Sequence, residues 1–215
     1  MESLMNRSLV ASAMVALSLA TAQPAAAQVQ AVTPAVAKAV VAAPGTALAG
    51  AAQGDVTVVE YLDYNCPYCR KMHAELQGLL KADPKARVLY KQWPVFGPVS
   101  TYAARTVLAA TWQGKDLAAH DALITSTSRL DSQDSVRRRL ATAGVDLARL
   151  DRDLTAHKAE IDALLARSEE EAQLLGLRGT PALVIGSTLV PGGLPSAMLQ
   201  RLVAQERNES QAPSR

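Results

Sequence analysis

The chain has 215 residues, two cysteines and a formal net charge of +2, and 49% of its residues are hydrophobic. This apolar fraction is ample for a folded core of ordinary domain size and excludes wholesale disorder, and two cysteines are too few for a disulfide-rich scaffold. The near-neutral charge and the 4% of aromatic residues do not fit a nucleic-acid-binding surface.

The N-terminus has the pattern of a secretion signal. Arg7 gives a weakly positive start, residues 9–22 are apolar, and residues 24–27 (Pro-Ala-Ala-Ala) offer the small side chains that a signal peptidase reads. The apolar stretch is shorter than the roughly 20 residues that span a bilayer. We therefore predict a cleaved signal peptide over residues 1–27 and a periplasmic or secreted protein. An uncleaved N-terminal anchor is the alternative.

Residues 28–53 are rich in alanine, valine and proline and carry one charge, on Lys38. The segment lacks a long helical period, so we predict a flexible arm. A rival interpretation is a short helix over residues 36–43 that helps oligomerisation, although Pro34 and Pro44 leave room for only about two turns.

The predicted ordered part begins near Asp55. Residues 56–62 are β-branched and apolar on both faces, which is typical of a central strand covered on two sides. Helical spacing follows over residues 67–82, and a second strand is predicted over residues 86–92. A strand, a helix and a strand in this order indicate a crossover between parallel neighbours.

Helical patterns dominate the next part of the chain, and strand signals return after it. Helices are predicted over residues 102–112, 117–125, 133–143, 146–157, 158–175 and 195–206, and a hairpin over residues 182–190. We accordingly expect a first part over 54–99, a helical insertion over 100–176, a second part over 177–207 and a disordered tail over 208–215.

The chemistry is concentrated in Cys66-Pro67-Tyr68-Cys69, which follows the first strand and opens the next helix. Pro67 suits the first helical turn and makes Cys66 the N-cap. The Cys66 sulfur would then face free N–H groups and the positive end of the helix dipole, and both lower a thiol pKa. We predict an exposed attacking Cys66 and a more buried, resolving Cys69.

A zinc site, an inert disulfide and a chance pairing are the alternatives. Zinc needs two further ligands, and His73 alone is near in sequence because His120 and His157 fall in the helical block. A four-residue loop makes a poor disulfide staple. We interpret His73 as an exposed histidine, the alternative being a cation that favours the Cys66 thiolate. No metal and no organic cofactor is expected.

Glu60 is the second informative residue. It shares a strand face with residues 56, 58 and 62 and lies six residues before Cys66. A carboxylate in an apolar strand is costly without a role or a partner. We expect it beneath the cysteines, with a raised pKa, passing protons to or from Cys69. The alternative is a solvated side chain at an open strand end.

These features resemble the DsbA family of exported thiol-disulfide oxidoreductases. The resemblance is carried by residues 58–61, the Cys-Pro-Tyr-Cys motif, Thr180-Pro181 and the helical block, and it covers residues 55–206. It implies an α/β fold of the thioredoxin-like type with an inserted helical subdomain. It also implies exported proteins with cysteines as substrates and a membrane redox partner for regeneration.

The same resemblance assigns the site residues. It implies a redox-active disulfide between Cys66 and Cys69, and a cis Pro181 facing them as a third catalytic residue. Glu60, Pro67, Tyr68 and Thr180 take the supporting positions. Tyr68 stands where strong oxidases of the family often have histidine, so oxidation, isomerisation and reduction all stay open. The alternative class is a thioredoxin-like adaptor or chaperone-type binding module without redox turnover.

Overall fold

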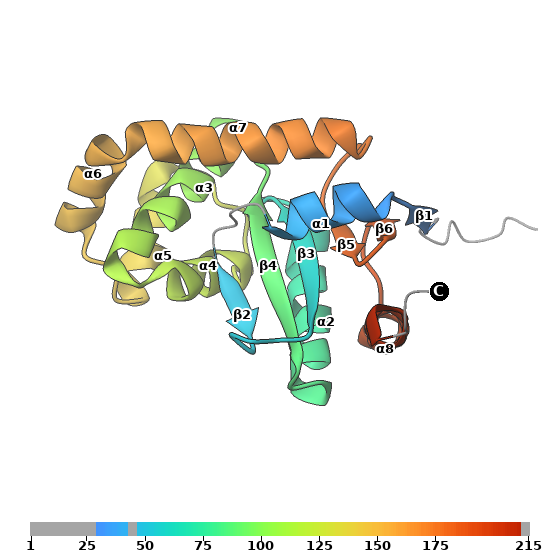
Figure 1. Cartoon of the computed structure of the whole chain (residues 1–215). Helices are drawn as coiled ribbons and strands as arrows, with labels where there is room; N and C mark the ends of the chain where they lie inside the picture. The colour runs from blue at the N-terminus through green and yellow to red at the C-terminus, as the bar shows by residue number, and fades with distance from the viewer. Residues whose placement is uncertain (1–28, 43–46, 212–215) are drawn as a thin grey trace, which may run out of the picture.

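The structure, a computed structural model, describes residues 29–42 and 47–211. The predicted signal peptide over residues 1–27 lies outside these residues. Within them, no helix combines the length and the apolar character needed to cross a bilayer. Figure 1 shows a central sheet, helices on both of its faces, and a group of helices at one end.

The elements follow one another as strands and helices in a mixed order. They are β1 (Gln30–Ala31), α1 (Pro34–Ala42), β2 (Leu48–Gly50), β3 (Val56–Leu62), α2 (Pro67–Ala82), β4 (Ala86–Gln92), α3 (Pro98–Ala110), the 3-10 turn η1 (Thr111–Gln113), α4 (Asp116–Ile124), α5 (Gln133–Thr142), α6 (Leu147–Ala156), α7 (Lys158–Leu174), β5 (Ala182–Ile185), β6 (Thr188–Pro191) and α8 (Ser196–Gln211).

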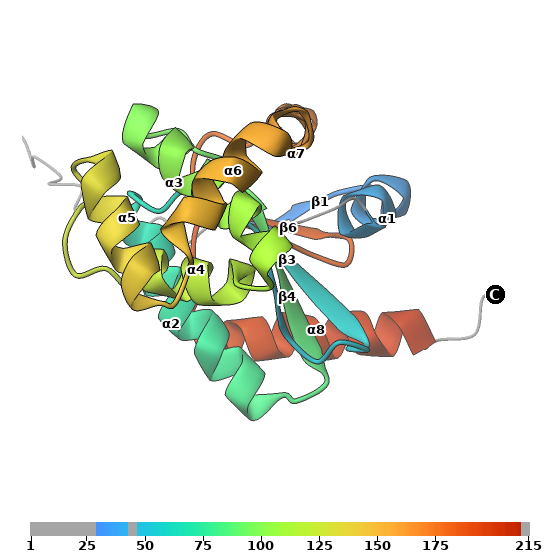
Figure 2. The ribbon, with the colours of Figure 1, turned by 90° about the vertical axis from the view of Figure 1, so that its left-hand side faces the viewer.

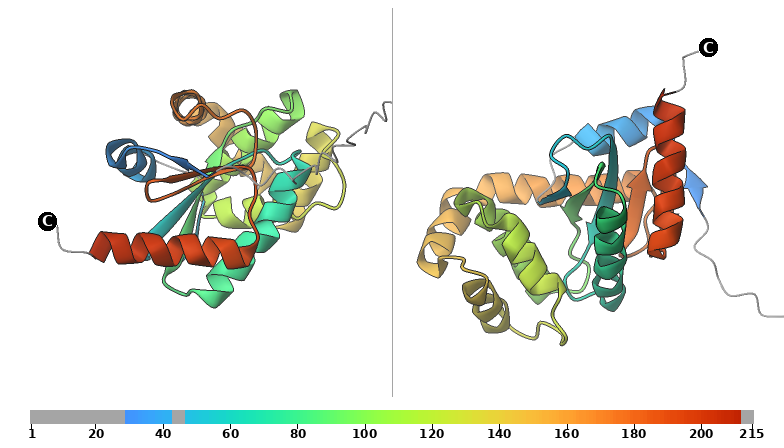
Figure 3. Two further views of the ribbon diagram at one scale, coloured as in Figure 1. Left: turned by 90° about the vertical axis from the view of Figure 1, so that its right-hand side faces the viewer. Right: turned by 90° about the horizontal axis from the view of Figure 1, so that it is seen from below.

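The six strands form one mixed sheet in the order β1-β6-β5-β3-β4-β2. β3 runs parallel to β4 and antiparallel to β5, which confirms the crossover predicted for residues 56–92. In Figure 3, α2 and α8 cover one face of the sheet while α1 and α7 cover the other. Helices α3 to α6 lie together at one end (Figure 2). The predicted α/β thioredoxin-like fold with a helical insertion is confirmed.

The two faces of β3 belong to two different hydrophobic clusters. Val58 and Leu62 pack with the apolar side of α2, whereas Val59 and Tyr61 pack with α1 and α7. Because successive strand side chains alternate between faces, Glu60 points to the α2 side, the side that carries the cysteines. This alternation directs a carboxylate toward the thiols.

The prediction of a flexible arm over residues 28–53 is wrong for the residues that the structure describes there. β1 pairs with β6, and β2 pairs with β4, so short strands at both sheet edges complete the backbone ladder. Between them, α1 buries Ala37 and Val40 against the sheet. A helix at this place was the rival interpretation. Its role in oligomerisation stays a prediction.

The predicted disordered tail over residues 208–215 is also too long. α8 continues to Gln211, and residues 212–215 lie outside the described part. Arg207 anchors the helix because its guanidinium donates two hydrogen bonds to Asp55, at 2.7 and 2.8 Å, and contacts Asp83 at 2.8 Å. The predicted helix end is too early because the sequence alone does not show that Arg207 pairs with Asp55 and Asp83.

Candidate active site

Cys66 lies in the turn between the end of β3 and the start of α2. It is the N-cap of α2, with extended backbone angles (φ −77°, ψ 117°), and a proline follows in the first turn. Cys66 thus occupies the predicted N-cap position, although its side chain makes no capping hydrogen bond. An N-cap side chain faces the N–H groups that have no partner within the helix. The helix start is therefore built to stabilise negative charge on the Cys66 sulfur.

Asp63 and Asn65 fix the turn that presents Cys66. The buried Asp63 carboxylate accepts hydrogen bonds from the Asn65 amide (2.7 Å) and the Ser100 hydroxyl (2.7 Å). It also accepts from the backbone amides of Val95 (2.7 Å) and Phe96 (2.9 Å). Sequence analysis missed this carboxylate. An aspartate two residues before an asparagine, directly after a strand, is the turn signal that points to it.

Both cysteines are free thiols, so the structure is that of the reduced dithiol. The prediction of an exposed Cys66 is wrong: Cys66 is 1% exposed and Cys69 is fully buried. The covering element is the loop before β5, since the Cys66 thiol donates a hydrogen bond to the Thr180 carbonyl oxygen at 3.1 Å.

The two thiols have opposite acidities. The pKa of Cys66 falls from 9.0 to about 6, chiefly because the Cys69 thiol donates a hydrogen bond to the Cys66 sulfur. Burial opposes this shift, while Thr180 and the amides of Cys69 and Tyr68 add to it. Burial raises the pKa of Cys69 far above its ordinary value, and its hydrogen bond to Cys66 and the nearby Glu60 raise it further. Cys66 is the ready thiolate and Cys69 the protonated partner.

Glu60 lies buried beneath this pair, with 1% of its surface exposed. Burial, and then the charge of Cys66, raise the pKa of its carboxyl well above 4.5. Its Oε1 has no hydrogen-bond partner in the part of the chain that the structure describes. A buried carboxyl held in its protonated form can donate a proton to a neighbouring group.

The remaining predicted residues surround Cys66. The Thr180–Pro181 peptide bond is cis, and Thr180 contacts the Cys66 sulfur as described above. Pro67 occupies the first turn of α2. Tyr68 is 65% exposed and points away from the core. All seven predicted site residues thus lie on the same corner of the fold, formed by β3, the start of α2 and the loop before β5.

His73 differs from its prediction as an exposed histidine. It is 8% exposed, and its ring lies 5.5 Å from that of His120 on α4. The α2 face that carries His73 packs against α4, and sequence spacing alone cannot show such a contact between distant helices.

Exposed apolar side chains lie beside the motif. Tyr68 follows Cys66 in α2, and Val95 and Phe96, each 44% exposed, belong to the loop that Asp63 ties to the Cys66 turn. Hydrophobic side chains left exposed around a reactive group are typical of protein-binding surfaces. A cavity of about 400 Å³ also opens along Thr180 and Pro181.

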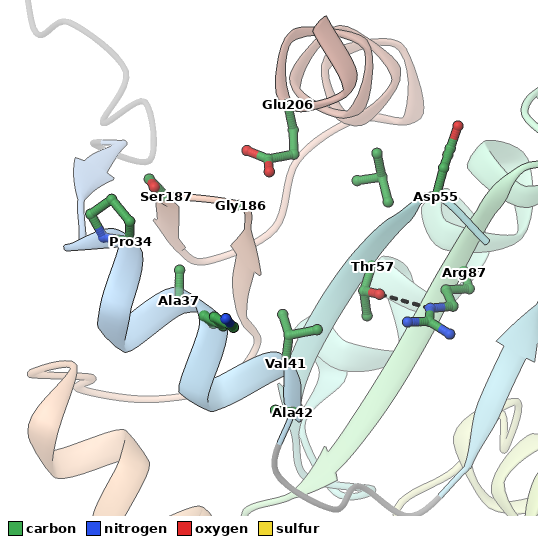
Figure 4. Close-up of a pocket in the computed structure, with 12 residues that line it drawn as sticks. Pro34, Ala37, Val41, Ala42, Asp55, Thr57, Arg87, Gly186, Ser187 and Glu206 are labelled. Carbon is green, nitrogen blue, oxygen red and sulfur yellow. Dashed lines mark hydrogen bonds between the residues drawn. The ribbon is translucent and has the colours of Figure 1, made fainter. Parts of the chain in front are cut away.

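A second cavity, of about 460 Å³, is remote from the cysteines. It lies between α1, the β5–β6 turn and α8, at the start of β3, whereas Cys66 follows the end of that strand. Figure 4 shows its lining, in which Arg87 donates a hydrogen bond to Thr57 at 2.7 Å. No cysteine borders it. This cavity is separate from the candidate active site.

Comparisons with known proteins agree with this geometry. A family model described as a DSBA-like thioredoxin domain matches residues 57–204. Among solved structures, a thioredoxin-like oxidoreductase from Silicibacter pomeroyi DSS-3 is 42% identical, with a TM-score of 0.75 over 80% of this chain and 97% of that one. The catalytic domain of Proteus mirabilis ScsC is 28% identical, with a TM-score of 0.65 over 75% of this chain and 88% of that one.

Two further matches differ in how far they extend. A periplasmic thioredoxin-like protein from Salmonella enterica serovar Typhimurium is 26% identical, with a TM-score of 0.67 over 83% of this chain and 99% of that one. The Na⁺/H⁺ antiporter NhaA 1 of Mycolicibacterium gilvum (strain PYR-GCK) is 27% identical over 162 residues, which are 74% of this chain and 26% of the antiporter. The chain thus spans about a quarter of the length of such curated relatives.

Proposed function

Because the chain belongs to the family of DsbA-like thioredoxin domains, we propose that it is an exported thiol-disulfide oxidoreductase that exchanges disulfides with protein substrates through Cys66 and Cys69. One observation carries the proposal: a cysteine at a helix N-cap has a pKa near 6, and a buried cysteine one turn away has a raised pKa. A low pKa makes a thiol a nucleophile and a good leaving group at neutral pH.

In the oxidising direction the reaction starts from the Cys66–Cys69 disulfide. A substrate thiolate attacks the Cys66 sulfur, the bond between the two cysteines breaks, and its electron pair leaves on Cys69. Cys69 then takes a proton. A second substrate thiolate attacks the substrate sulfur of the mixed disulfide, and Cys66 leaves as a thiolate. Two substrate thiols have become one disulfide, and the protein has gained two electrons. The reverse sequence reduces a substrate disulfide.

The surrounding residues have separate roles in this scheme. Glu60 supplies the proton to the departing Cys69 thiolate and takes it back in reverse. The ring of Pro67 fixes the backbone angle φ at a helical value, which favours the start of α2 at this position. Thr180 and Pro181 hold the attacking substrate beside Cys66. Tyr68, with Val95 and Phe96, offers apolar surface to an unfolded substrate segment.

Export and partners belong to the same proposal. The predicted signal peptide over residues 1–27 and the similarity to the periplasmic protein from Salmonella favour a periplasmic or secreted protein. Substrates would be exported proteins with cysteines, and a membrane redox protein would restore the working state.

The reduction potential of the Cys66–Cys69 pair tests the proposal. Stabilising the thiolate stabilises the reduced protein, by about 1.4 kcal/mol, or roughly 30 mV, for each unit of pKa. A Cys66 pKa of about 6 lies between those of thioredoxin (about 7) and DsbA (about 3.5). We expect a potential between their values of about −270 and about −120 mV.

The measurement is equilibration of the full chain with glutathione buffers, followed by alkylation and mass determination of the free thiols. The parent treated with excess dithiothreitol, in which both thiols are alkylated, sets the fully reduced reference. A potential below about −300 mV, as in structural disulfides, would contradict the proposal and support an inert staple.

A further inference from the structure

Two histidines and an aspartate that are distant in sequence meet between α2 and α4. His73 lies on α2, and His120 and Asp121 are neighbours on α4. One ligand atom from each of the three residues lies within 4.8 Å of the other two. The Nε2 of His73 is 3.9 Å from Oδ1 of Asp121. These residue types are common ligands of transition metals.

The cluster leaves three buried polar atoms without a hydrogen-bond partner in residues 29–42 and 47–211. They are Nδ1 of His73, Nε2 of His120 and Oδ1 of Asp121. A buried polar atom without a partner costs about 1–3 kcal/mol. Oδ1 of Asp121 faces Nε2 of His73, so the unpartnered atoms of Asp121 and His120 point to a ligand that the protein chain does not supply.

His120 is held in the orientation that a ligand needs. Its Nδ1 lies 3.1 Å from the Tyr64 hydroxyl, and its ring stacks on Tyr90 with 3.8 Å between the ring centres. The roles in this contact depend on the tautomer: Nε2 carries the free lone pair when Nδ1 donates to the Tyr64 oxygen, which also accepts from Gln92 at 3.0 Å. A hydrogen bond at the far ring nitrogen is how proteins orient metal-binding histidines.

We propose that His73, His120 and Asp121 form a binding site for one divalent transition-metal ion of the Zn²⁺ type. Two imidazoles and one carboxylate suit zinc, and they disfavour calcium and magnesium, which take oxygen ligands. Asp121 is half-exposed although its Oδ1 is buried, so the site lies near the surface of the helical block. The sequence analysis expected no metal and set His120 aside as part of the helical block, whereas the fold brings His120 and Asp121 next to His73.

The test is calorimetric titration of Zn²⁺ into the full chain in its disulfide form, so that the two cysteines cannot act as ligands. We expect one ion per chain. Asp121→Asn and His73→Gln should each weaken binding by at least about tenfold, because the loss of even an outer-shell partner costs about 10- to 100-fold. His157→Gln is the matched control, because that partly buried histidine stacks on Trp112 and forms its own pair with Glu160 at 2.9 Å. It should bind as the parent does.

Co²⁺ as a second probe reports the ligand set, and the expected spectrum shows a four-coordinate ion without thiolate charge-transfer bands. Asp121→Asn replaces a half-exposed side chain, and circular dichroism checks that its fold is unchanged. The proposal is overturned if the oxidised protein binds no stoichiometric Zn²⁺, or if both ligand variants bind as tightly as the parent. It is independent of the proposed redox function, and disulfide exchange by Asp121→Asn should match the parent.

Discussion

Replacing Cys66 by serine should reduce disulfide exchange with a protein substrate to the uncatalysed rate. The physical reason is that the attacked and attacking sulfur is lost, and a serine hydroxyl at the same N-cap cannot form a disulfide. The measurement is the rate at which the full chain reduces insulin, or reactivates scrambled ribonuclease, in a glutathione buffer. This is the largest effect that we expect from any single substitution.

Cys69→Ser is the matched variant for this experiment. It keeps the Cys66 nucleophile but lacks the thiol that resolves the mixed disulfide, so it should accumulate a covalent complex with the substrate. The complex should be visible on a non-reducing gel and absent from Cys66→Ser. Normal turnover by Cys66→Ser would refute the proposed mechanism and favour a binding module in which the cysteines are incidental.

Glu60→Gln should slow the exchange reaction by about 100-fold at neutral pH, at the low end of what general acid-base groups contribute. Glutamine has nearly the same shape but cannot donate a proton to the departing Cys69 thiolate. Cys69 is buried and its raised pKa makes the unprotonated leaving group costly. The step affected is therefore the departure of Cys69, which stopped-flow mixing with a model thiol measures.

The same variant should change the pH dependence of stability. The pKa of Glu60 is raised in the folded protein above 4.5, so the folded state binds more protons than the unfolded state in the range above pH 4.5. The parent therefore loses stability as the pH rises from 4.5 toward the folded pKa, and Glu60→Gln does not. Urea unfolding of reduced protein should show the advantage of the variant growing with pH.

Glu170→Gln, on the exposed side of α7, is the control for loss of one negative charge and should alter neither property. Two results would contradict the role assigned to Glu60. One is an unchanged rate of Cys69 departure in Glu60→Gln. The other is a stability difference between parent and variant that stays constant above pH 4.5.

The centre of the fold could be predicted from the sequence because its signals are local. The strand over residues 56–62, the helix over residues 67–82 and the strand over residues 86–92 begin and end in the structure at the predicted positions. Period-two and helical hydrophobicity, a proline at a helix start and an Asp-Pro stop suffice for these. The Cys66 cap follows from the same local rules.

The errors concern contacts between distant segments. The strands of residues 30–31 and 48–50 are too short for a hydrophobic pattern, and they exist because β6 and β4 offer unpaired edges. Cys66 was predicted to be exposed because the Thr180 loop that covers it lies 114 residues along the chain. His73 was predicted to be exposed because nothing in α2 indicates that His120 packs against it. In each case, contacts between segments that are distant in sequence determine the strand pairing or the burial of the side chain.

The most direct test is the ionisation of Cys66 itself, followed by the ultraviolet absorbance of the thiolate in the reduced protein as the pH is varied. The Cys66→Ser variant provides the baseline. An apparent pKa of about 6 is the expected result, because the Cys69 thiol donates a hydrogen bond to the Cys66 sulfur, and Thr180 and the first amides of α2 lower the pKa further. An apparent pKa near the ordinary value of 9.0 would show that this helix start does not hold a thiolate, and the account would fail.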